Sequence, residues 1–133
     1  MGLDMYLTAR RYVWGSEEEL QANIKEVVKP FMAEWEPKEV SFRVGYWRKA
    51  NAIHKWFVDN VQGGEDNCNP YPVTKEHLIQ LHNLCNQVLN DNSLAESLLP
   101  SQSGFFFGST EYDQGYYQDL RDTIDIINNI LEY

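Results

Sequence analysis

The sequence predicts an α+β fold in which about four helices pack on a small sheet, within a single domain of residues 1–133. Two stretches are rich in aromatic and β-branched residues, which favours strands. Four longer stretches repeat apolar residues at intervals of three and four, the period of an amphipathic helix. A chain of 133 residues with 43% hydrophobic residues can bury one core, and this composition excludes general disorder.

The N-terminal third predicts a strand followed by a helix. Residues 5–14 are rich in Tyr, Thr, Val and Trp, and Gly15 ends this strand. Ser16 and Glu19 have the spacing of a capping box, so the helix is expected to begin there. The apolar face of this helix consists of Leu20, Ile24, Val27 and Phe31. Pro30 is expected to end or kink it.

A second strand and a second helix follow in the middle of the chain. The strand begins at Glu39, and one of its faces carries Val40, Phe42 and Val44. From about Trp47 the period becomes helical, with an apolar face of Ala50, Ile53, Phe57 and Val61. Gly63 and Gly64 end this helix.

The C-terminal half predicts two more helices. After a loop at residues 65–72, Thr74 is the expected N-cap of a helix with inward residues Leu78, Leu81, Cys85 and Val88. The last helix begins near Tyr116, and its apolar face consists of Leu120, Ile124, Ile127 and Leu131. Between them, residues 105–107 are three Phe flanked by glycines, which predicts a short buried strand.

The net charge and the lengths of the apolar runs limit which partners and which location are expected for the chain. Twenty Asp and Glu stand against 11 Lys and Arg, and the net charge of −9 repels phosphate backbones, so general nucleic-acid binding is not expected. No apolar run exceeds three residues, which predicts neither a membrane span nor a signal-peptide core. We therefore expect a cytoplasmic protein with no membrane partner. The sequence leaves open whether it forms a homo-oligomer.

Catalytic and metal-binding patterns are weak in this sequence. His77 and His82 are five residues apart and do not share a helix face, and two cysteines are too few for a four-cysteine zinc site. No Gly-x-Ser-x-Gly nucleophile motif occurs. We therefore expect no metal, no cofactor and no catalytic residue, and an enzyme is the weaker hypothesis. Cys68 and Cys85 are expected to be reduced thiols.

Two stretches carry the candidate ligand-binding residues. In the first, Arg48, Asn51 and Lys55 are spaced three and four apart, which predicts one polar stripe on a helix beside Trp47 and His54. The second stretch offers neutral hydrogen-bonding groups and an aromatic ring, namely Gln102, Ser103, Ser109 and Tyr112. An ordinary amphipathic helix and a pair of turns around a core strand remain the alternatives for these stretches.

A family resemblance rests on three blocks of the sequence. MGLDMYL at the start, YWRKANAIHKWFV in the centre and LLPSQSGFFFGSTEYD near the end resemble the signature stretches of a small family of phage and prophage proteins. The resemblance spans nearly the whole chain and brings no catalytic residue with it. It implies a phage-borne accessory protein that acts in the cytoplasm of a bacterial host, where such proteins often counter host defence.

Three hypotheses for function follow. The leading one is a non-enzymatic protein that sequesters a small nucleotide-derived ligand between residues 46–56 and 101–112. There, Arg48 and Lys55 would hold phosphate, Asn51, His54 and Gln102 would read polar edges, and Trp47 or Tyr112 would stack. The alternative is an acidic interaction protein, a nucleic-acid mimic, whose Asp-rich last helix occupies a basic site on a host defence protein. The third is an enzyme in which His54 and Glu111 serve as acid and base.

Overall fold

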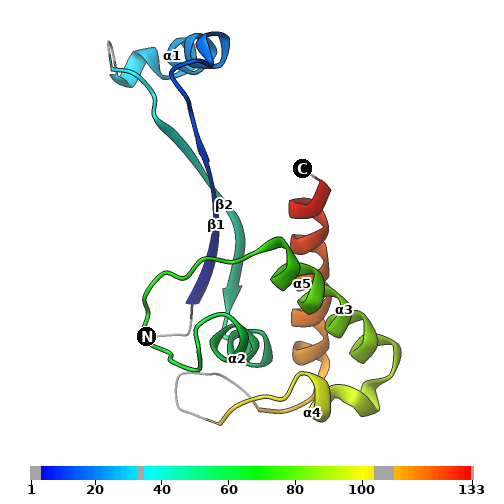
Figure 1. The fold of residues 1–133 in the computed structure, drawn as a ribbon. Helices are drawn as coiled ribbons and strands as arrows, with labels where there is room; N and C mark the ends of the chain where they lie inside the picture. Colours follow the sequence, from blue (N-terminus) through cyan, green and yellow to red (C-terminus); the bar gives the residue numbers. More distant parts are fainter. Residues whose placement is uncertain (1–3, 33–34, 104–109, 133) are drawn as a thin grey trace. The chain divides into compact units, whose positions relative to one another are not determined.

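The computed structural model describes residues 4–32, 35–103 and 110–132 (Figure 1). It confirms the α+β class, but the described residues form five α-helices rather than about four. The additional helix is α4, a single turn that follows a short 3₁₀ segment. The elements in chain order are β1 (Asp4–Tyr12), α1 (Glu18–Met32), β2 (Glu39–Arg48), α2 (Asn51–Asn60), α3 (Lys75–Asn90), α4 (Ala95–Leu98) and α5 (Gln114–Glu132).

Contacts within the chain divide it into two compact units. The helical unit comprises residues 1–6 and 46–133, and the ribbon unit comprises residues 7–45. The two strands form a two-stranded antiparallel sheet and contribute to both units. No described helix is long and apolar enough to cross a membrane.

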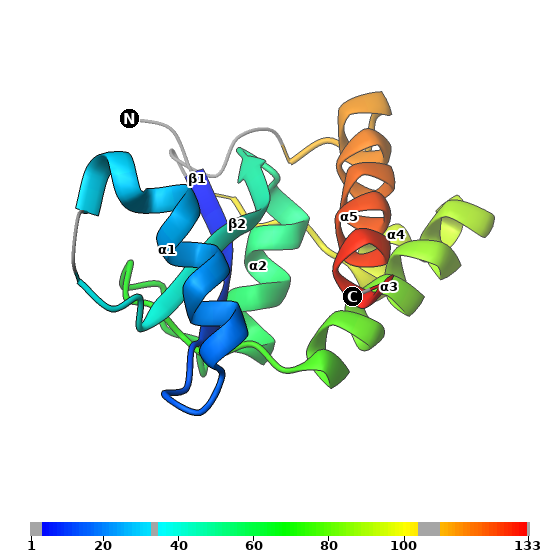
Figure 2. The ribbon, with the colours of Figure 1, turned by 90° about the horizontal axis from the view of Figure 1, so that it is seen from above.

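The helical unit is built on helix-to-helix packing. Helices α3 and α5 lie side by side, and α2 contacts α5 (Figure 2). The inward residues predicted for α3 are all buried, namely Leu78, Leu81, Cys85 and Val88. The predicted N-cap is also confirmed, because the Thr74 hydroxyl accepts the backbone N–H of His77 at 3.1 Å. The buried thiol of Cys85 has a pKa raised to about 12 by desolvation, which makes it unreactive.

The start of α2 differs from the prediction. We expected helix from about Trp47, but β2 continues to Arg48 and α2 begins at Asn51. Burial explains the difference, since Gly45 and Trp47 are buried while Tyr46 and Arg48 are exposed, the alternation of a strand. The polar stripe of Arg48, Asn51 and Lys55 on one helix is therefore wrong. Within α2, Ile53 and Phe57 are buried as predicted.

The core face of α5 is shifted by one residue from the prediction. Leu120 and Ile127 are fully buried, but Ile124 is only half-buried, and Thr123 is buried beside it. The Thr123 hydroxyl accepts the indole N–H of Trp47 at 2.9 Å and donates to the carbonyl of Asp119 at 2.7 Å. A polar core residue is thus fully hydrogen-bonded, as burial of a hydroxyl requires.

The ribbon unit places α1 between the two strands in the chain. Helix α1 begins at Glu18, one residue later than a cap at Ser16 predicts, and its first intrahelical bond runs from the backbone N–H of Gln21 to the carbonyl of Glu17 at 3.0 Å. Pro30 lies inside the helix. The predicted apolar face is not a core face, since Val27 is 75% and Phe31 is 80% exposed.

The predicted Phe-rich strand at residues 105–107 lies outside the described residues.

Candidate ligand-binding site

A pair of hydrogen bonds joins the two stretches that the sequence analysis singled out. The buried side chain of Asn51 donates from Nδ2 to the carbonyl of Gln102 at 2.7 Å. Its Oδ1 accepts the backbone N–H of Gln102 at 2.6 Å. This two-point contact bridges 51 positions of sequence, and it shows that the start of α2 and the described start of the second stretch, at Gln102, are spatial neighbours.

A cavity of about 200 Å³ lies next to this bridge, within the helical unit. The buried residues of its lining are Asn51, Ala52, Ile53, Tyr116 and Leu120. The Tyr116 hydroxyl donates to the carbonyl of Leu99 at 2.7 Å, which fixes the ring in the core. The buried lining residues are therefore apolar or already hydrogen-bonded within the chain, so a ligand would be bound by the charged lining residues.

The lining includes two cations that are adjacent in the sequence, Arg48 and Lys49. Arg48 is the last residue of β2, and Lys49 lies in the turn that leads into α2. Lys49 has a φ of 52°, a left-handed conformation that costs a non-glycine residue about 1 kcal/mol or more. Both side chains are exposed, and neither forms an ion pair within the described part of the chain. The turn thus presents two unpaired positive charges at the cavity.

The lining also contains three carboxylates, Glu111, Asp113 and Asp119. Asp113 accepts the backbone N–H of Tyr116 at 3.1 Å and so caps the start of α5. Desolvation, with smaller contributions from the charges of Asp122 and Asp113, raises the pKa of Asp119 from 3.8 to about 6. A carboxylate that is costly to ionise gains from a ligand that donates a hydrogen bond to it.

Among the predicted site residues that the structure describes, Arg48 and Asn51 line this cavity and six others do not. Three of these six lie on or next to α2, namely Trp47, His54 and Lys55. Trp47 is 5% exposed, and its ring packs 5.6 Å from that of Phe57, so stacking on a ligand would require it to leave the core. His54 is buried and lies 3.0 Å from Asp66, measured from Nε2 to the carboxylate. Lys55 forms an ion pair with Asp59 one turn along α2.

The remaining predicted residues belong to the neighbouring loop. Gln102 meets Asn51 through its backbone, and Ser103 is exposed beside it. The Tyr112 hydroxyl accepts the backbone N–H of Ser101 at 3.3 Å, and its ring meets Tyr116 edge-on at 5.0 Å. Ser109 lies outside the described residues.

Sequence reasoning missed Lys49, Asp113 and Asp119 as lining residues. The predicted helix start near Trp47 is about one turn earlier than the observed start at Asn51, so Lys49 is expected inside a helix. A lysine also gives no sequence signal for the left-handed conformation that it adopts here. The sequence marks Asp119 only as one of the acidic residues of the Asp-rich last helix, although its neighbour Leu120 is fully buried. The acid–base pairing of His54 with Glu111 also finds no common cavity, since Glu111 lines this one and His54 does not.

Comparison of the chain with protein-family models, with curated proteins and with solved structures gave no match.

Proposed function

We propose that the protein is a non-enzymatic binder of a small nucleotide-derived ligand, which it holds at the cavity between Arg48, Lys49 and Asp119. The observation that carries this proposal is that the lining of one cavity contains both cations, Arg48 and Lys49, and three carboxylates. A nucleotide has the matching polarity. Its phosphate is anionic, while its ribose hydroxyls and base N–H groups donate hydrogen bonds.

The volume of the cavity supports binding of only part of the ligand, and the types of its lining residues support binding without catalysis. A cavity of about 200 Å³ is smaller than the roughly 300–1,000 Å³ of pockets that enclose a drug-sized molecule. We expect it to take the polar end of the ligand, with the remainder outside. The described lining contains no Ser, Thr, Cys or His, the side chains that most often serve as nucleophile or base.

The charge of the whole protein sets how binding must work. With a net charge of −9, the long-range field opposes an anionic ligand. Affinity therefore has to come from short-range contacts, above all the planar fork of Arg48 on phosphate. Sequestration of a nucleotide signal in an infected bacterium is the biological role that the resemblance to phage proteins adds to this proposal.

Calorimetric titration with a panel of mono-, di- and cyclic nucleotides, and with the matching nucleosides, tests the proposal. We expect Arg48→Ala to weaken nucleotide binding by about 10- to 100-fold, and Arg48→Lys to recover only part of it. Asp119→Asn should weaken nucleosides and nucleotides alike, because it removes the negative charge and replaces one acceptor oxygen by an NH2 donor, while both cations stay in place. The control is Lys55→Ala, which removes a cation outside the cavity and should leave the affinity unchanged.

Absence of heat with every member of the panel would contradict the proposal. An equal loss with Lys55→Ala would move the site to the polar stripe that the sequence suggested. Both outcomes are readable on folded protein, since Arg48 and Lys49 are exposed and their truncation leaves the core intact.

A second candidate is supported by the distribution of acidic residues. The helical unit holds thirteen Asp and Glu against five Lys and Arg, and Asp122 and Asp125 are exposed on α5. We propose as the alternative that this surface occupies a basic site on a host defence protein. The double variant Asp122→Asn with Asp125→Asn should then abolish the complex with a host nuclease and leave nucleotide heats unchanged.

A further inference from the structure

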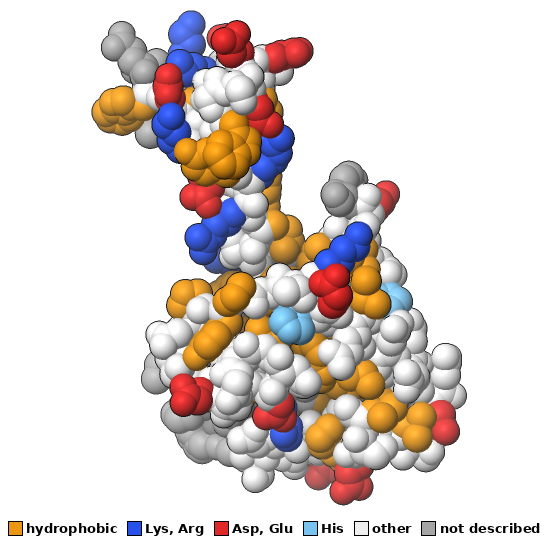
Figure 3. Space-filling view, viewed as in Figure 1, with side chains coloured by type: hydrophobic (Ala, Val, Ile, Leu, Met, Phe, Trp, Pro, Cys, Tyr) orange, Lys and Arg blue, Asp and Glu red, His pale blue; other side chains and the backbone are white. Residues whose placement is uncertain are grey.

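The ribbon unit exposes large apolar side chains that a folded chain normally buries. Val27, Phe31 and Trp35 are 75%, 80% and 71% exposed, and Trp14 and Phe42 are also mostly exposed. In the space-filling view, hydrophobic side chains of this unit, at the top, lie next to both positive and negative ones (Figure 3). Apolar surface of this extent, with a polar rim, is typical of an interaction site.

These residues surround a groove formed within the unit. The groove between α1 and β2 has a volume of about 770 Å³, and its apolar lining consists of Ile24, Val27, Val28, Trp35, Pro37 and Val40. It is the apolar face of α1, predicted from sequence as a core face, that forms one side of it. The ribbon unit alone therefore leaves unburied the surface that its amphipathic pattern was built to bury.

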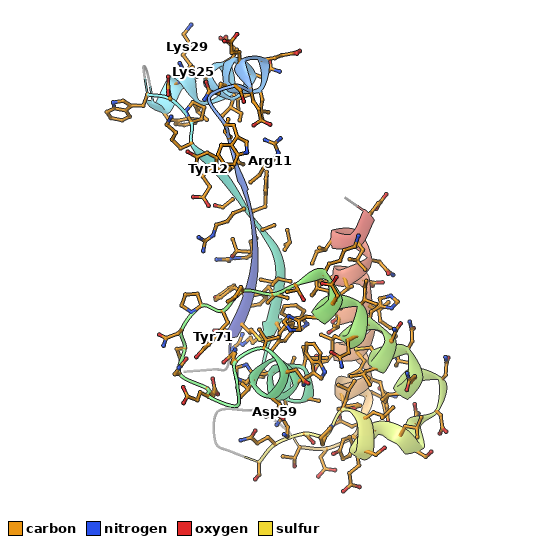
Figure 4. All side chains as sticks on the ribbon, in the orientation of Figure 1. Arg11, Tyr12, Lys25, Lys29, Asp59 and Tyr71 are labelled. Carbon is orange, nitrogen blue, oxygen red and sulfur yellow. The ribbon has the colours of Figure 1, made fainter. Side chains whose placement is uncertain are left out.

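The charges at the groove are of both signs and suit a second copy of the same surface. Lys25 and Lys29 lie on α1 (Figure 4), and Glu36, Lys38 and Glu39 line the strand side. Glu36 pairs with Lys38 and Glu39 with Arg10 of the same chain, but these pairs are exposed and weak, so a partner's lysine can replace them. The unit as a whole carries six Lys and Arg against seven Asp and Glu, a net charge of −1. The helical unit carries −8, so charge repulsion opposes contact between two helical units more than contact between two ribbon units.

We infer that the ribbon units of two chains pair about a two-fold axis, each inserting the apolar face of α1 into the groove of the other. In such an isologous contact, every attraction occurs twice. Lys29 of one copy then lies against Glu36 of its partner, and Glu36 of the first copy lies against Lys29 of the second. Apolar burial holds the dimer, and the charge pairs set its register.

The test is the oligomeric state of the full chain, measured by sedimentation velocity over a wide range of protein concentration. We expect a monomer–dimer equilibrium, with the dissociation constant raised at least about 100-fold by Val27→Glu. The matched control is Ile79→Glu, which places the same charge at a 42% exposed apolar position of α3 and should leave the dissociation constant unchanged.

A charge exchange tests the register without touching an apolar residue. Lys29→Glu and Glu36→Lys should each weaken their own homodimer, because each puts like charges together twice. An equimolar mixture of the two variants should recover a dimer of wild-type stability, since every pair is again of opposite sign. A chain that is monomeric at every concentration, or a mixture that recovers nothing, would overturn the inference.

Discussion

The helical unit and the ribbon unit contain the same kind of helix and use it differently. In α3, the apolar positions Leu81 and Val88 are fully buried against α5 and its neighbours. In α1, the equally regular positions Val27 and Phe31 are exposed. Periodicity therefore identifies which face of a helix is apolar, but it carries no information on what covers that face. In the helical unit the cover is another helix of the chain, and in the ribbon unit we assign it to a second copy.

The two units also differ in where they carry charge. Residues 7–45 are close to neutral at −1, whereas the helical unit holds −8 of the net charge of −9. The near-neutral unit has the most exposed large apolar residues, Val27, Phe31 and Trp35, whereas most of the buried core lies in the acidic unit. This division lets one protein remain charged enough to stay dispersed while it keeps one surface on which contact is not opposed by repulsion.

Truncation of one phenylalanine in each unit should give the largest contrast. Phe57→Ala removes a buried ring that packs on Trp47 and Trp56, and we expect it to lower the free energy of unfolding by about 3–5 kcal/mol. Phe31→Ala should change it by less than about 0.5 kcal/mol, because that ring is exposed. Denaturant unfolding at a protein concentration that keeps the chain monomeric measures both. Equal losses would mean that the two faces are buried alike.

A smaller effect is expected at the bridge between α2 and the loop of residues 101–103. Asn51→Ala removes two hydrogen bonds to the Gln102 backbone and should lower the free energy of unfolding by about 1–2 kcal/mol. Ser103→Ala, at the exposed neighbouring position, serves as the control and should have no effect. Faster hydrogen exchange at Gln102 in Asn51→Ala would localise the loss. If exchange there is unaffected, the loop is held by other contacts.

Much of the fold could be predicted from the sequence because its signals are local. The buried residues of α3, the Thr74 cap and the start of β2 all follow from period, capping chemistry and strand propensity. The start of α2 could not be predicted this way. Trp47 and Arg48 suit a strand or a helix equally well, and the choice is made by the distant Thr123, which accepts the Trp47 indole N–H.

The candidate site could be predicted only in part from the sequence, because it also depends on contacts between distant residues. The proximity of the two stretches was predicted from their shared polar and aromatic content, and the bridge from Asn51 to Gln102 confirms it. The individual lining residues depend on helix phase and on one left-handed residue, Lys49. A difference of about four residues between the predicted and observed starts of α2 was therefore enough to place Lys55 in the site and to leave Lys49 out.

The smallest expected effect is the loss of folding stability caused by ionisation of Asp119 in the helical unit, and this loss depends on pH. The pKa of Asp119 is raised from 3.8 to about 6, so its ionised form is disfavoured in the folded chain. Below about pH 4, Asp119 is protonated in both the folded and unfolded states and costs nothing. Above pH 6 it is ionised in both, and the full penalty is present. Stability that involves this group therefore falls as the pH rises from about 4 through 6.

Asp119→Asn should accordingly stabilise the protein at pH 8 by about 1 kcal/mol relative to its effect at pH 4, a figure that allows for partial exposure to solvent. Thermal unfolding of both proteins at the two pH values measures this difference. Glu36→Gln in the ribbon unit is the control with opposite sign, because the hydrogen bond from Lys38 lowers the pKa of Glu36. Its ionised form is favoured, so neutralising it should bring no gain at pH 8. A gain from Glu36→Gln equal to that from Asp119→Asn would show that the net charge, rather than the burial of Asp119, determines the cost.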